Sequence, residues 1–325
     1  MSKHLFSYVA ASALLLCGAL ASTTAHADED VPSLKGKTIG ISSAGNDHDW
    51  NIKAYQGAVD EVKRLGGTVI GLDAGWVDSK QISQIQTLIS QKPDAIIEEL
   101  GTAAALEPAF KKVREAGIPL FTLDTNTSYS INTVTSDNWH IGEELALKLV
   151  SDIGGEGNII VFNGFYSVTP CAIRYDQLKS VLKYYPKVHV IEPELKEVIP
   201  NTVLDAQTQI SEILNKYPKG EIKAIWSSWD VPQVGAVQAL AAAGRSEIKT
   251  YGVDGSPEAI ALLKDPAQPA TAIIAQQPGL IGKTSVDNIA RYLAGKRDLP
   301  KTTFISSLLA TKDNVAQVQA QLGQK

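Results

Sequence analysis

The sequence contains little cysteine, with two among 325 residues. Cys17 lies in an apolar N-terminal stretch, and Cys171 is the only cysteine that follows it. An exported chain with one cysteine forms no internal disulfide, so we expect its stability to come from its hydrophobic core. The sequence assigns no role to Cys171.

Long hydrophobic runs are also missing, since none reaches the roughly 18 residues that a membrane-spanning helix needs. The apolar run Val9–Leu20 follows the basic residue Lys3 and precedes the small residues of Ala25-His26-Ala27. This order is typical of a secretory signal peptide, which we predict to be residues 1–27. The mature chain, residues 28–325, is therefore expected to be soluble and exported.

Basic residues are in the minority, with 30 Lys and Arg against 35 Asp and Glu and a formal net charge of −5. Removal of residues 1–27 takes away Lys3 and no acid, so the charge becomes −6. Nucleic acids and anionic membranes bind clustered Lys and Arg, and no such cluster is present. We expect neither as a partner. A DNA-binding repressor is excluded as well, since no helix-turn-helix precedes the first strand and an export signal does.

Residue sets that carry catalysis or hold metal ions are also absent from the pattern. Asp47-His48-Asp49 has no second histidine at a useful spacing, so no metal and no cofactor are predicted. Glu98 and Glu99 are adjacent at the end of a predicted strand and point to opposite faces, so they cannot flank one glycosidic bond. No Ser-His-Asp or Cys-His set is evident. The sequence therefore favours a protein that is not an enzyme.

What the sequence does contain is a regular alternation of short apolar runs and amphipathic segments. The predicted strands are residues 38–42, 68–72, 95–97, 120–124, 131–135, 158–162, 188–191, 224–227, 249–253, 271–275 and 303–309. The predicted helices are residues 50–65, 79–90, 103–116, 139–152, 172–183, 203–214, 233–243, 257–263, 279–293 and 314–321. This alternation predicts right-handed βαβ units and doubly wound parallel sheets. About 298 residues (325 less 27) suit two domains of the usual ~100 to 200 residues.

Two of the predicted strands end in an aspartate, Asp124 and Asp254. In open α/β sheets ligands bind at the carboxyl ends of the strands, so both side chains are expected to face a cleft. A helix cap or a turn is the alternative role for each. A carboxylate accepts hydrogen bonds from adjacent hydroxyl groups, which is why sugar sites use it, and we predict this role for both.

Several short motifs occur along the chain in a particular order. They are Trp50-Asn51 ahead of Lys53-Ala54-Tyr55-Gln56-Gly57-Ala58, then Thr122-Leu123-Asp124, Ser136-Asp137-Asn138, Arg174, Gly252-Val253-Asp254-Gly255-Ser256-Pro257 and Ala275-Gln276-Gln277-Pro278. Each is weak alone. In this order and behind a signal peptide, they resemble the type I periplasmic binding proteins of bacterial ABC sugar importers, the ribose-binding-protein-like group. The resemblance covers essentially the whole mature length.

The resemblance implies an α/β fold with two Rossmann-like doubly wound lobes, three crossover hinges and a ligand cleft between the lobes. It places the crossings near Ser136, Gln276 and Phe304. The N-terminal lobe is then residues 28–136 plus 277–304, and the C-terminal lobe is residues 137–276 plus 305–325. It also implies a monomer in the periplasm that delivers its ligand to an inner-membrane ABC permease.

The resemblance further implies ligand-binding residues on both lobes. The predicted set is His48, Trp50, Asn51, Asp124, Thr125, Arg174, Trp229, Asp254 and Gln276, with Glu99 as a further candidate for the cleft. Arg174 would donate from its guanidinium fork, and Trp50 and Trp229 would clamp the apolar face of a sugar or polyol from opposite lobes. Capping or core packing is the alternative for the polar and aromatic members. Thr125 stands where the ribose-binding pattern has an arginine and Trp229 where it has an amide, which argues against ribose.

The predicted ligand is a small neutral sugar or polyol. Two carboxylates face one guanidinium, so an acid sugar or a phosphate would meet repulsion in a closed cleft. Two tryptophans favour a pentose, a tetrose-like sugar or a linear polyol over a disaccharide. A sensory receptor that presents the ligand to a chemoreceptor or sensor kinase is the first alternative, and a secreted carbohydrate-active enzyme is the second.

Overall fold

The structure is a computed structural model that describes residues 31–323. The predicted signal peptide and its cleavage site lie outside the described residues, as do the last two residues of the predicted C-terminal lobe. The described chain forms two six-stranded sheets. We call each sheet with its helices a lobe, the first lobe and the second lobe.

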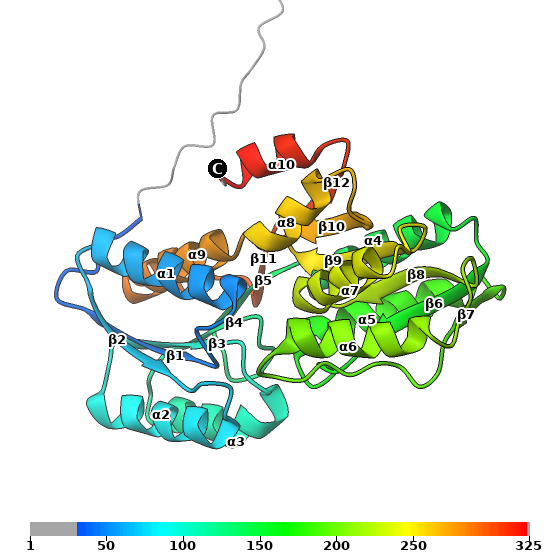
Figure 1. The fold of residues 1–325 in the computed structure, drawn as a ribbon. Helices are drawn as coiled ribbons and strands as arrows, with labels where there is room; N and C mark the ends of the chain where they lie inside the picture. The colour runs from blue at the N-terminus through cyan, green and yellow to red at the C-terminus, as the bar shows by residue number, and fades with distance from the viewer. Residues whose placement is uncertain (1–30, 324–325) are drawn as a thin grey trace, which may run out of the picture. The chain divides into compact units, whose positions relative to one another are not determined.

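The first lobe is built on a sheet with the strand order β11-β5-β4-β3-β1-β2, in which every neighbouring pair is parallel. Its strands are β1 (Thr38–Ser43), β2 (Thr68–Asp73), β3 (Ala95–Glu99), β4 (Leu120–Leu123), β5 (Asn132–Ser136) and β11 (Thr302–Ile305). Its helices are α1 (Asp49–Arg64), α2 (Asp78–Gln91), α3 (Ala103–Glu115) and α9 (Pro278–Leu293). Helices α1 and α9 cover one face of this sheet, and α2 and α3 cover the other (Figure 1).

The second lobe repeats the scheme with the strand order β12-β10-β9-β8-β6-β7, in which only β12 is antiparallel to its neighbour. Its strands are β6 (Gly157–Phe162), β7 (Val188–Val190), β8 (Ile222–Ser227), β9 (Lys249–Asp254), β10 (Ala270–Ala275) and β12 (Leu308–Thr311). Its helices are α4 (Asn138–Asp152), α5 (Thr169–Leu182), α6 (Thr202–Leu214), α7 (Asp230–Ala242), α8 (Pro257–Lys264) and α10 (Val315–Gln321).

Alternating side chains of the second sheet bury themselves on its two faces. Ile159 and Val161 of β6 join the core beneath α4 and α5, whereas Ile160 and Phe162 join the core beneath α6 and α7. Successive residues of a strand point to opposite faces, so a strand covered on both sides is apolar throughout. This explains why the strands could be recognised as continuous apolar runs.

The chain passes from one sheet to the other three times, after Ser136, after Ala275 and after Ile305. The predicted single strand 303–309 is wrong, because it is two strands in two different sheets. Ile305 of β11 pairs with Ser136 of β5 in the first sheet, and Leu308 of β12 pairs with Ala275 of β10 in the second. The apolar pattern runs on through the passage, so local periodicity does not reveal that the pairing partners change.

Helix α9 belongs to the first lobe although it follows β10 of the second. A Cβ atom at Gly282 of α9 would lie 2.0 Å from the carbonyl oxygen of Ala54 in α1. The two helix backbones therefore approach so closely that only glycine fits there. This contact fixes residues 278–293 against α1, and through them the segment that leads to the third passage.

Asp137 caps helix α4, because its side chain accepts a hydrogen bond from the backbone N–H of His140. Within residues 31–323 no helix combines the length and apolar character that crossing a membrane demands.

Candidate ligand-binding site

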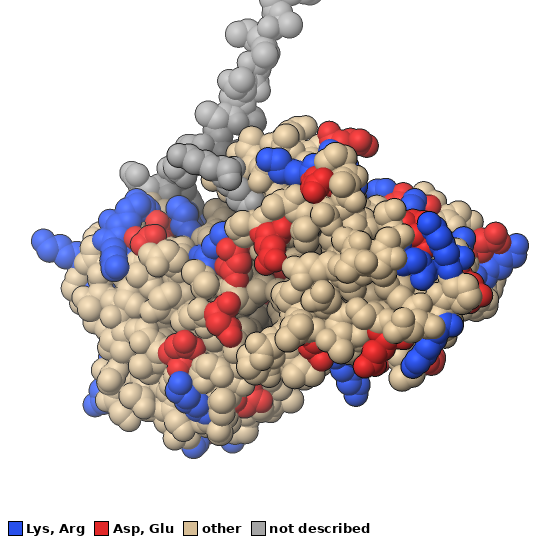
Figure 2. All heavy atoms as spheres, viewed as in Figure 1, with Lys and Arg blue, Asp and Glu red and all other residues tan. Residues whose placement is uncertain are grey.

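The carboxyl ends of strands from both sheets border one cavity. It encloses about 470 Å³ of space free of atoms, including its opening to solvent. Its lining is His48, Trp50, Asn51, Trp76, Leu100, Asp124, Phe165, Val168, Pro170, Cys171, Arg174, Ile199, Trp229, Asp254 and Gln276. Figure 2 shows the surface hollowed between the side that carries α1 and the side that carries α7, with acidic side chains around the hollow.

Eight of the nine predicted ligand-binding residues line this cavity. His48, Trp50, Asn51 and Asp124 come from the first lobe, and Arg174, Trp229, Asp254 and Gln276 come from the second. The structure thus brings together side chains that lie more than 200 residues apart in the chain. Their roles toward a ligand stay a prediction, since no ligand is present.

Thr125 and Glu99 are placed differently from the other predicted residues. The hydroxyl of Thr125 donates to Glu98 and accepts from the backbone N–H of Gly101, within the first lobe. Glu99 is fully buried and outside the cavity lining, with Ser43 and Asn51 as neighbours of its carboxyl group. Glu98 contacts Gln81 of α2 instead, so the two glutamates point to opposite faces of β3 as predicted.

Both glutamates carry strongly shifted pKa values. Burial raises the pKa of Glu98 to about 8, and it raises the pKa of Glu99 well above its ordinary value. A carboxyl group that is buried without a cation is neutral near pH 7. Glu98 and Glu99 therefore contribute hydrogen-bonding groups to the first lobe without adding negative charge near pH 7.

The backbone around the cavity adopts conformations that non-glycine residues rarely use. Asp124 has a φ of 56° and Asp254 a φ of 108°, and the lining residues Leu100 and Trp76 have φ values of 50° and 62°. Strained positions of this kind cost about 1 to 3 kcal/mol each and cluster at ligand sites. The positive φ values of Asp124 and Asp254, at the ends of their strands, support the assignment of both residues to the site.

Arg174 organises the second-lobe wall. It is almost fully buried, its Nε donates to Asn138 Oδ1 at 2.8 Å, and its Nη1 donates to the carbonyl oxygen of Ser228 at 2.8 Å. The same Nη1 lies 3.6 Å from Asp254 Oδ1. A guanidinium held by two fixed acceptors presents its remaining N–H groups in one orientation.

Asp254 is held from two sides. Gln276 Nε2 donates to its Oδ1 at 2.5 Å, and Arg174 lies beside it. Burial raises the pKa of Asp254 above its ordinary value, and the nearby charge of Asp230 raises it further. The charge of Arg174 opposes both effects but does not cancel them. Gln276 Oε1 is buried without a partner, so the Asp254–Gln276 pair keeps acceptor capacity for a ligand.

Trp229 forms an aromatic wall together with Phe165. The two ring centroids are 5.1 Å apart in an edge-to-face arrangement, which aromatic rings favour. Trp229 Nε1 donates to Glu197 Oε1 at 3.1 Å, and Glu197 Oε2 accepts from the backbone N–H of Gly164. Glu197 thus connects the indole to the loop that carries Phe165 and fixes the position of both rings.

The first-lobe wall has polar atoms that lack partners. Trp50 Nε1, Asn51 Oδ1 and Nδ2, and Asp124 Oδ1 are all buried without a hydrogen bond. Burial raises the pKa of Asp124 to about 6, against the opposing influence of Thr135 and Arg174. Buried polar groups are normally satisfied, so donors and acceptors of this kind around a cavity indicate that a ligand supplies the missing partners.

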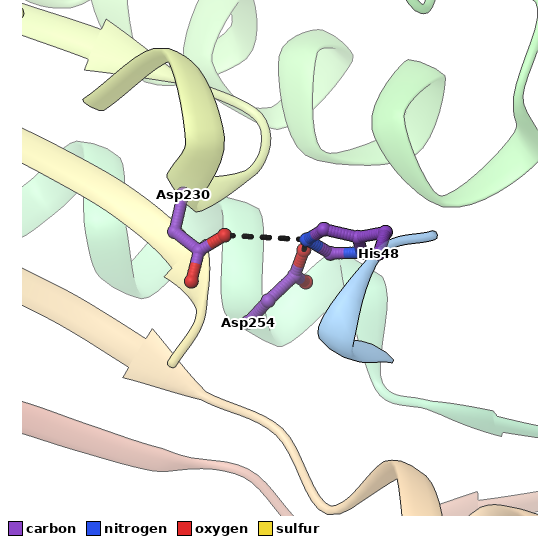
Figure 3. A group of neighbouring side chains, drawn as sticks. All are labelled: His48, Asp230 and Asp254. Atoms are coloured by element: carbon purple, nitrogen blue, oxygen red, sulfur yellow. Dashed lines mark ion pairs between the residues drawn. The ribbon is translucent and has the colours of Figure 1, made fainter. Parts of the chain in front are cut away.

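His48 reaches across to the second lobe. It is the residue before α1, and its Nε2 lies 3.5 Å from Asp230 Oδ1 and 4.0 Å from Asp254 Oδ2 (Figure 3). Burial acts to lower the pKa of His48, but the nearby carboxyl groups of Asp230, Asp254 and Asp49 raise it overall. Within residues 31–323 these three residues are the cluster that could hold a metal ion, and the sequence pattern did not reveal it.

Asp230 was missed because the helix begins earlier than predicted. The apolar pattern placed its start at Gln233, whereas α7 begins at Asp230 and the preceding residue is Trp229. Acidic residues are enriched in the first turn of a helix, so Asp230 directly after Trp229 could have indicated the earlier start of this helix.

The other missed lining residues come from loops and helix starts. The Trp76 side chain packs so closely on Gly45 that a Cβ atom at position 45 would lie 2.4 Å from Trp76 Nε1. Trp76 Nε1 also donates to Asp47 Oδ1 at 2.5 Å. Ile199 lies in an irregular segment ahead of α6, and no periodic pattern marks it. Cys171 also lines the cavity, and burial raises the pKa of its thiol to about 12, so the thiol is uncharged near neutral pH.

Two doubly wound lobes, three passages between them and one cavity lined from both sides define a two-lobed ligand-binding protein. Residues 39–297 match the family model described as a periplasmic binding protein domain. The chain belongs to this family of periplasmic solute-binding proteins, whose members include sugar-import binding proteins of ABC transporters.

Individual relatives agree with this assignment. The chain is similar to a solute-binding protein of an ABC transporter from Agrobacterium vitis, solved with bound allitol, with 60% identity, a TM-score of 0.87, and coverage of 89% of this chain and 100% of that one. It is similar to an ABC sugar transporter subunit from Rhodobacter sphaeroides, with 57% identity, a TM-score of 0.85, and coverage of 87% and 100%. The ribose import binding protein of Bacillus subtilis is 28% identical over 80% of this chain and 83% of that protein.

Proposed function

We propose that this protein captures a small neutral polyol, with a linear hexitol such as allitol as the leading candidate, and delivers it to an inner-membrane ABC permease. The observation that carries the proposal is the set of unpaired donors and acceptors on the first-lobe wall of a cavity that Phe165 and Trp229 also line. A linear polyol presents a hydroxyl group on each carbon and apolar C–H faces between them. The relative with 60% identity binds allitol, which is a ligand of this class.

The charges around the cavity favour a neutral ligand. Arg174 is already paired with Asp254, and the carboxylates of Asp124 and Asp230 add negative charge against His48. Among the described residues that line the cavity, the basic groups are Arg174 and His48, and both already face carboxylates. A phosphate or carboxylate group on the ligand would therefore meet repulsion, which costs several kcal/mol in a closed cleft. A neutral polyol instead donates hydroxyl protons to the carboxylates.

Capture proceeds by closure of the cleft. A ligand that contacts both lobes makes more contacts in the closed state, and this difference shifts the population toward closure. We assign residues 28–136 plus 277–304 to the moving N-terminal lobe and residues 137–276 plus 305–325 to the C-terminal lobe, with the hinge at the three passages. Thr125 and Glu99 act on the ligand only through their neighbours in this scheme.

Export and release complete the proposal. Residues 1–27 act as a cleavable signal peptide, and the mature monomer works in the periplasm. The ligand leaves unchanged, because the residues that face the cavity bind hydroxyl groups and form no nucleophile and base pair.

Isothermal titration calorimetry on the mature protein tests the ligand class. The panel contains allitol, ribitol, erythritol, allose, ribose and tagatose, with gluconate and ribose 5-phosphate as charged controls. We expect saturable binding of a polyol, no binding of the charged compounds, and recovery of the ligand unchanged by NMR. Binding confined to sugar acids, phosphates or amino acids would contradict the proposal, and conversion of the ligand would make the protein an enzyme.

A further inference from the structure

Asp230 is a buried carboxylate that the capture of a ligand does not by itself explain. It is fully buried, and its Oδ2 accepts from the backbone N–H of Ser256 at 2.7 Å. Its Oδ1 has no hydrogen-bond partner. His48 Nε2 lies 3.5 Å from this atom and is itself buried without a hydrogen bond. Two unpaired polar atoms of opposite character therefore face each other at slightly more than hydrogen-bond distance.

These two atoms come from different lobes. His48 precedes α1 of the first lobe, and Asp230 begins α7 of the second (Figure 3). The edge of the His48 ring also packs on Trp229, with 5.3 Å between the ring centroids. A hinge movement that separates the lobes separates this pair, and a closure a few tenths of an ångström tighter makes it a hydrogen bond.

We propose that Asp230 is a positioning residue that holds His48, as the imidazolium, against the second lobe when the cleft closes, so that ligand capture takes up a proton. This inference rests on the proposed function, because the ligand is what drives closure. A buried carboxylate without a counter-ion is costly, so closing the cleft over Asp230 favours the charged form of its neighbour His48. The charged imidazole then adds an N–H donor at the edge of the cavity.

The charges that face His48 agree on the sign of the effect. The charges of Asp230 on α7, Asp254 on β9 and Asp49 on α1 raise the pKa of His48, while Arg174 on α5 is turned toward Asp254. In the open state His48 meets solvent, where the pKa of a histidine is about 6.5. With Asp230 beside it, as in the structure, the pKa of His48 is raised. The contribution of His48 to ligand affinity is therefore largest below about pH 6.5 and falls as the pH rises through the raised value, by at most about tenfold per pH unit.

A divalent cation between the three side chains is the competing explanation for the cluster. The ligand atoms of His48, Asp230 and Asp254 all lie within 4.8 Å of one another. However, the Arg174 guanidinium lies 3.6 Å from Asp254, and Gln276 donates to the same carboxylate. A fixed positive charge and a filled acceptor beside the cluster disfavour a metal ion, and the proton is the better counter-charge.

Calorimetry with allitol between pH 5.5 and 8.5, in buffers of different ionisation enthalpy, measures both affinity and protons taken up. We compare the mature wild type with His48→Gln, Asp230→Asn and the double variant, and with His189→Gln as a control at an exposed position on β7. Asparagine at 230 keeps an oxygen for the N–H of Ser256. Wild type and control should show equal proton uptake. Both single variants should lose the part of the proton uptake that His48 contributes. Both should bind allitol about 10- to 100-fold more weakly at pH 6, and the double variant should bind no more weakly than either single variant.

The outcomes separate this inference from the proposed function. Binding of allitol with the same pH profile in wild type and in both single variants overturns the proton-linked closure and leaves the proposed function intact. Additive losses in the double variant overturn the positioning role of Asp230. Loss of binding after EDTA treatment, with recovery on adding a divalent metal, replaces the proton by a metal ion. Failure of every neutral sugar and polyol to bind overturns both the function and this inference.

Discussion

The two walls of the cavity differ in how far their polar groups are already paired. On the second-lobe wall, Arg174 donates to Asn138 and Ser228, and Gln276 donates to Asp254, while Gln276 Oε1 is left without a partner. On the first-lobe wall, the polar atoms of Trp50 and Asn51 and one oxygen of Asp124 have no partner.

Because of this difference, the two walls contribute to ligand binding in different ways. A wall that is already hydrogen-bonded has little conformational freedom left to lose on binding, so it orients the ligand at low cost. A wall with unpaired buried atoms is destabilised until the ligand supplies partners, so it gains most from closure. Changes in the second-lobe wall should therefore reduce both stability and affinity, and changes in the first-lobe wall should reduce affinity alone.

The largest effect is expected for Arg174→Met. The substitution keeps an unbranched, apolar side chain but removes two hydrogen bonds and the cation beside Asp254. Breaking a buried ion pair costs about 3 to 5 kcal/mol. The unfolding free energy should therefore fall by about this amount, and the dissociation constant for the polyol should rise by more than about 100-fold. Urea unfolding without ligand and calorimetry with allitol measure the two. Arg114→Met, on the exposed face of α3, should change neither by more than about 1 kcal/mol. Unchanged stability of Arg174→Met would remove the contrast between the walls.

Asp124→Asn should separate affinity from stability. The variant loses a charged acceptor for ligand hydroxyl groups, which weakens binding by about 1.5 to 3 kcal/mol. Without ligand it should be more stable than the wild type above pH 6, by up to about 3 kcal/mol, and equally stable below pH 4.

The sign of that pH dependence follows from the pKa of Asp124. Burial raises it to about 6 in the folded protein, from its ordinary 3.8. The folded state then holds a proton more tightly than the unfolded state, so the wild type loses stability as the pH rises from about 4 to 6. Thermal unfolding of both proteins between pH 4 and 8 measures this, and parallel curves would refute it.

Glu197→Ala should have an intermediate effect, since Glu197 does not line the cavity. It removes the acceptor of Trp229 Nε1 and of the Gly164 N–H, so the aromatic wall loses its fixed position. We expect about 1 kcal/mol of lost affinity, seen mainly as a faster dissociation rate in stopped-flow fluorescence. Glu197→Gln keeps an oxygen acceptor and should restore most of the affinity. Equal losses in both variants would mean that the charge of Glu197, and not its hydrogen bonds, matters.

The smallest effect is expected for Trp50→Phe. Phenylalanine keeps an aromatic face toward the cavity and removes only the unpaired Nε1 donor. Stability should be unchanged, and affinity should fall by about 0.5 to 1.5 kcal/mol if the ligand accepts that hydrogen bond. Trp50→Ala, measured beside it, should lose more because the apolar contact is lost as well. An affinity of Trp50→Phe equal to the wild type would leave this indole as an apolar wall only.

The sequence by itself determined the strands, helices and lobe architecture. The strands are buried on both faces and are therefore continuous apolar runs, and the helices follow at regular spacing, so both are visible as local patterns. Asp124 and Asp254 were predictable because strand ends in such sheets meet at one edge. Resemblance to a known family then located Arg174, Gln276 and His48, which no local pattern marks as functional.

Tertiary structure alone decided which side chains meet across the cleft. Asp230 became visible only as the partner of His48, about 180 residues earlier in the chain, and Glu197 only as the acceptor of Trp229. The division of one apolar run into β11 and β12 likewise depends on which sheet supplies the pairing strand. Local periodicity records the burial of a segment, whereas hydrogen-bond partners and pKa shifts arise from groups that the folded chain brings together from distant positions.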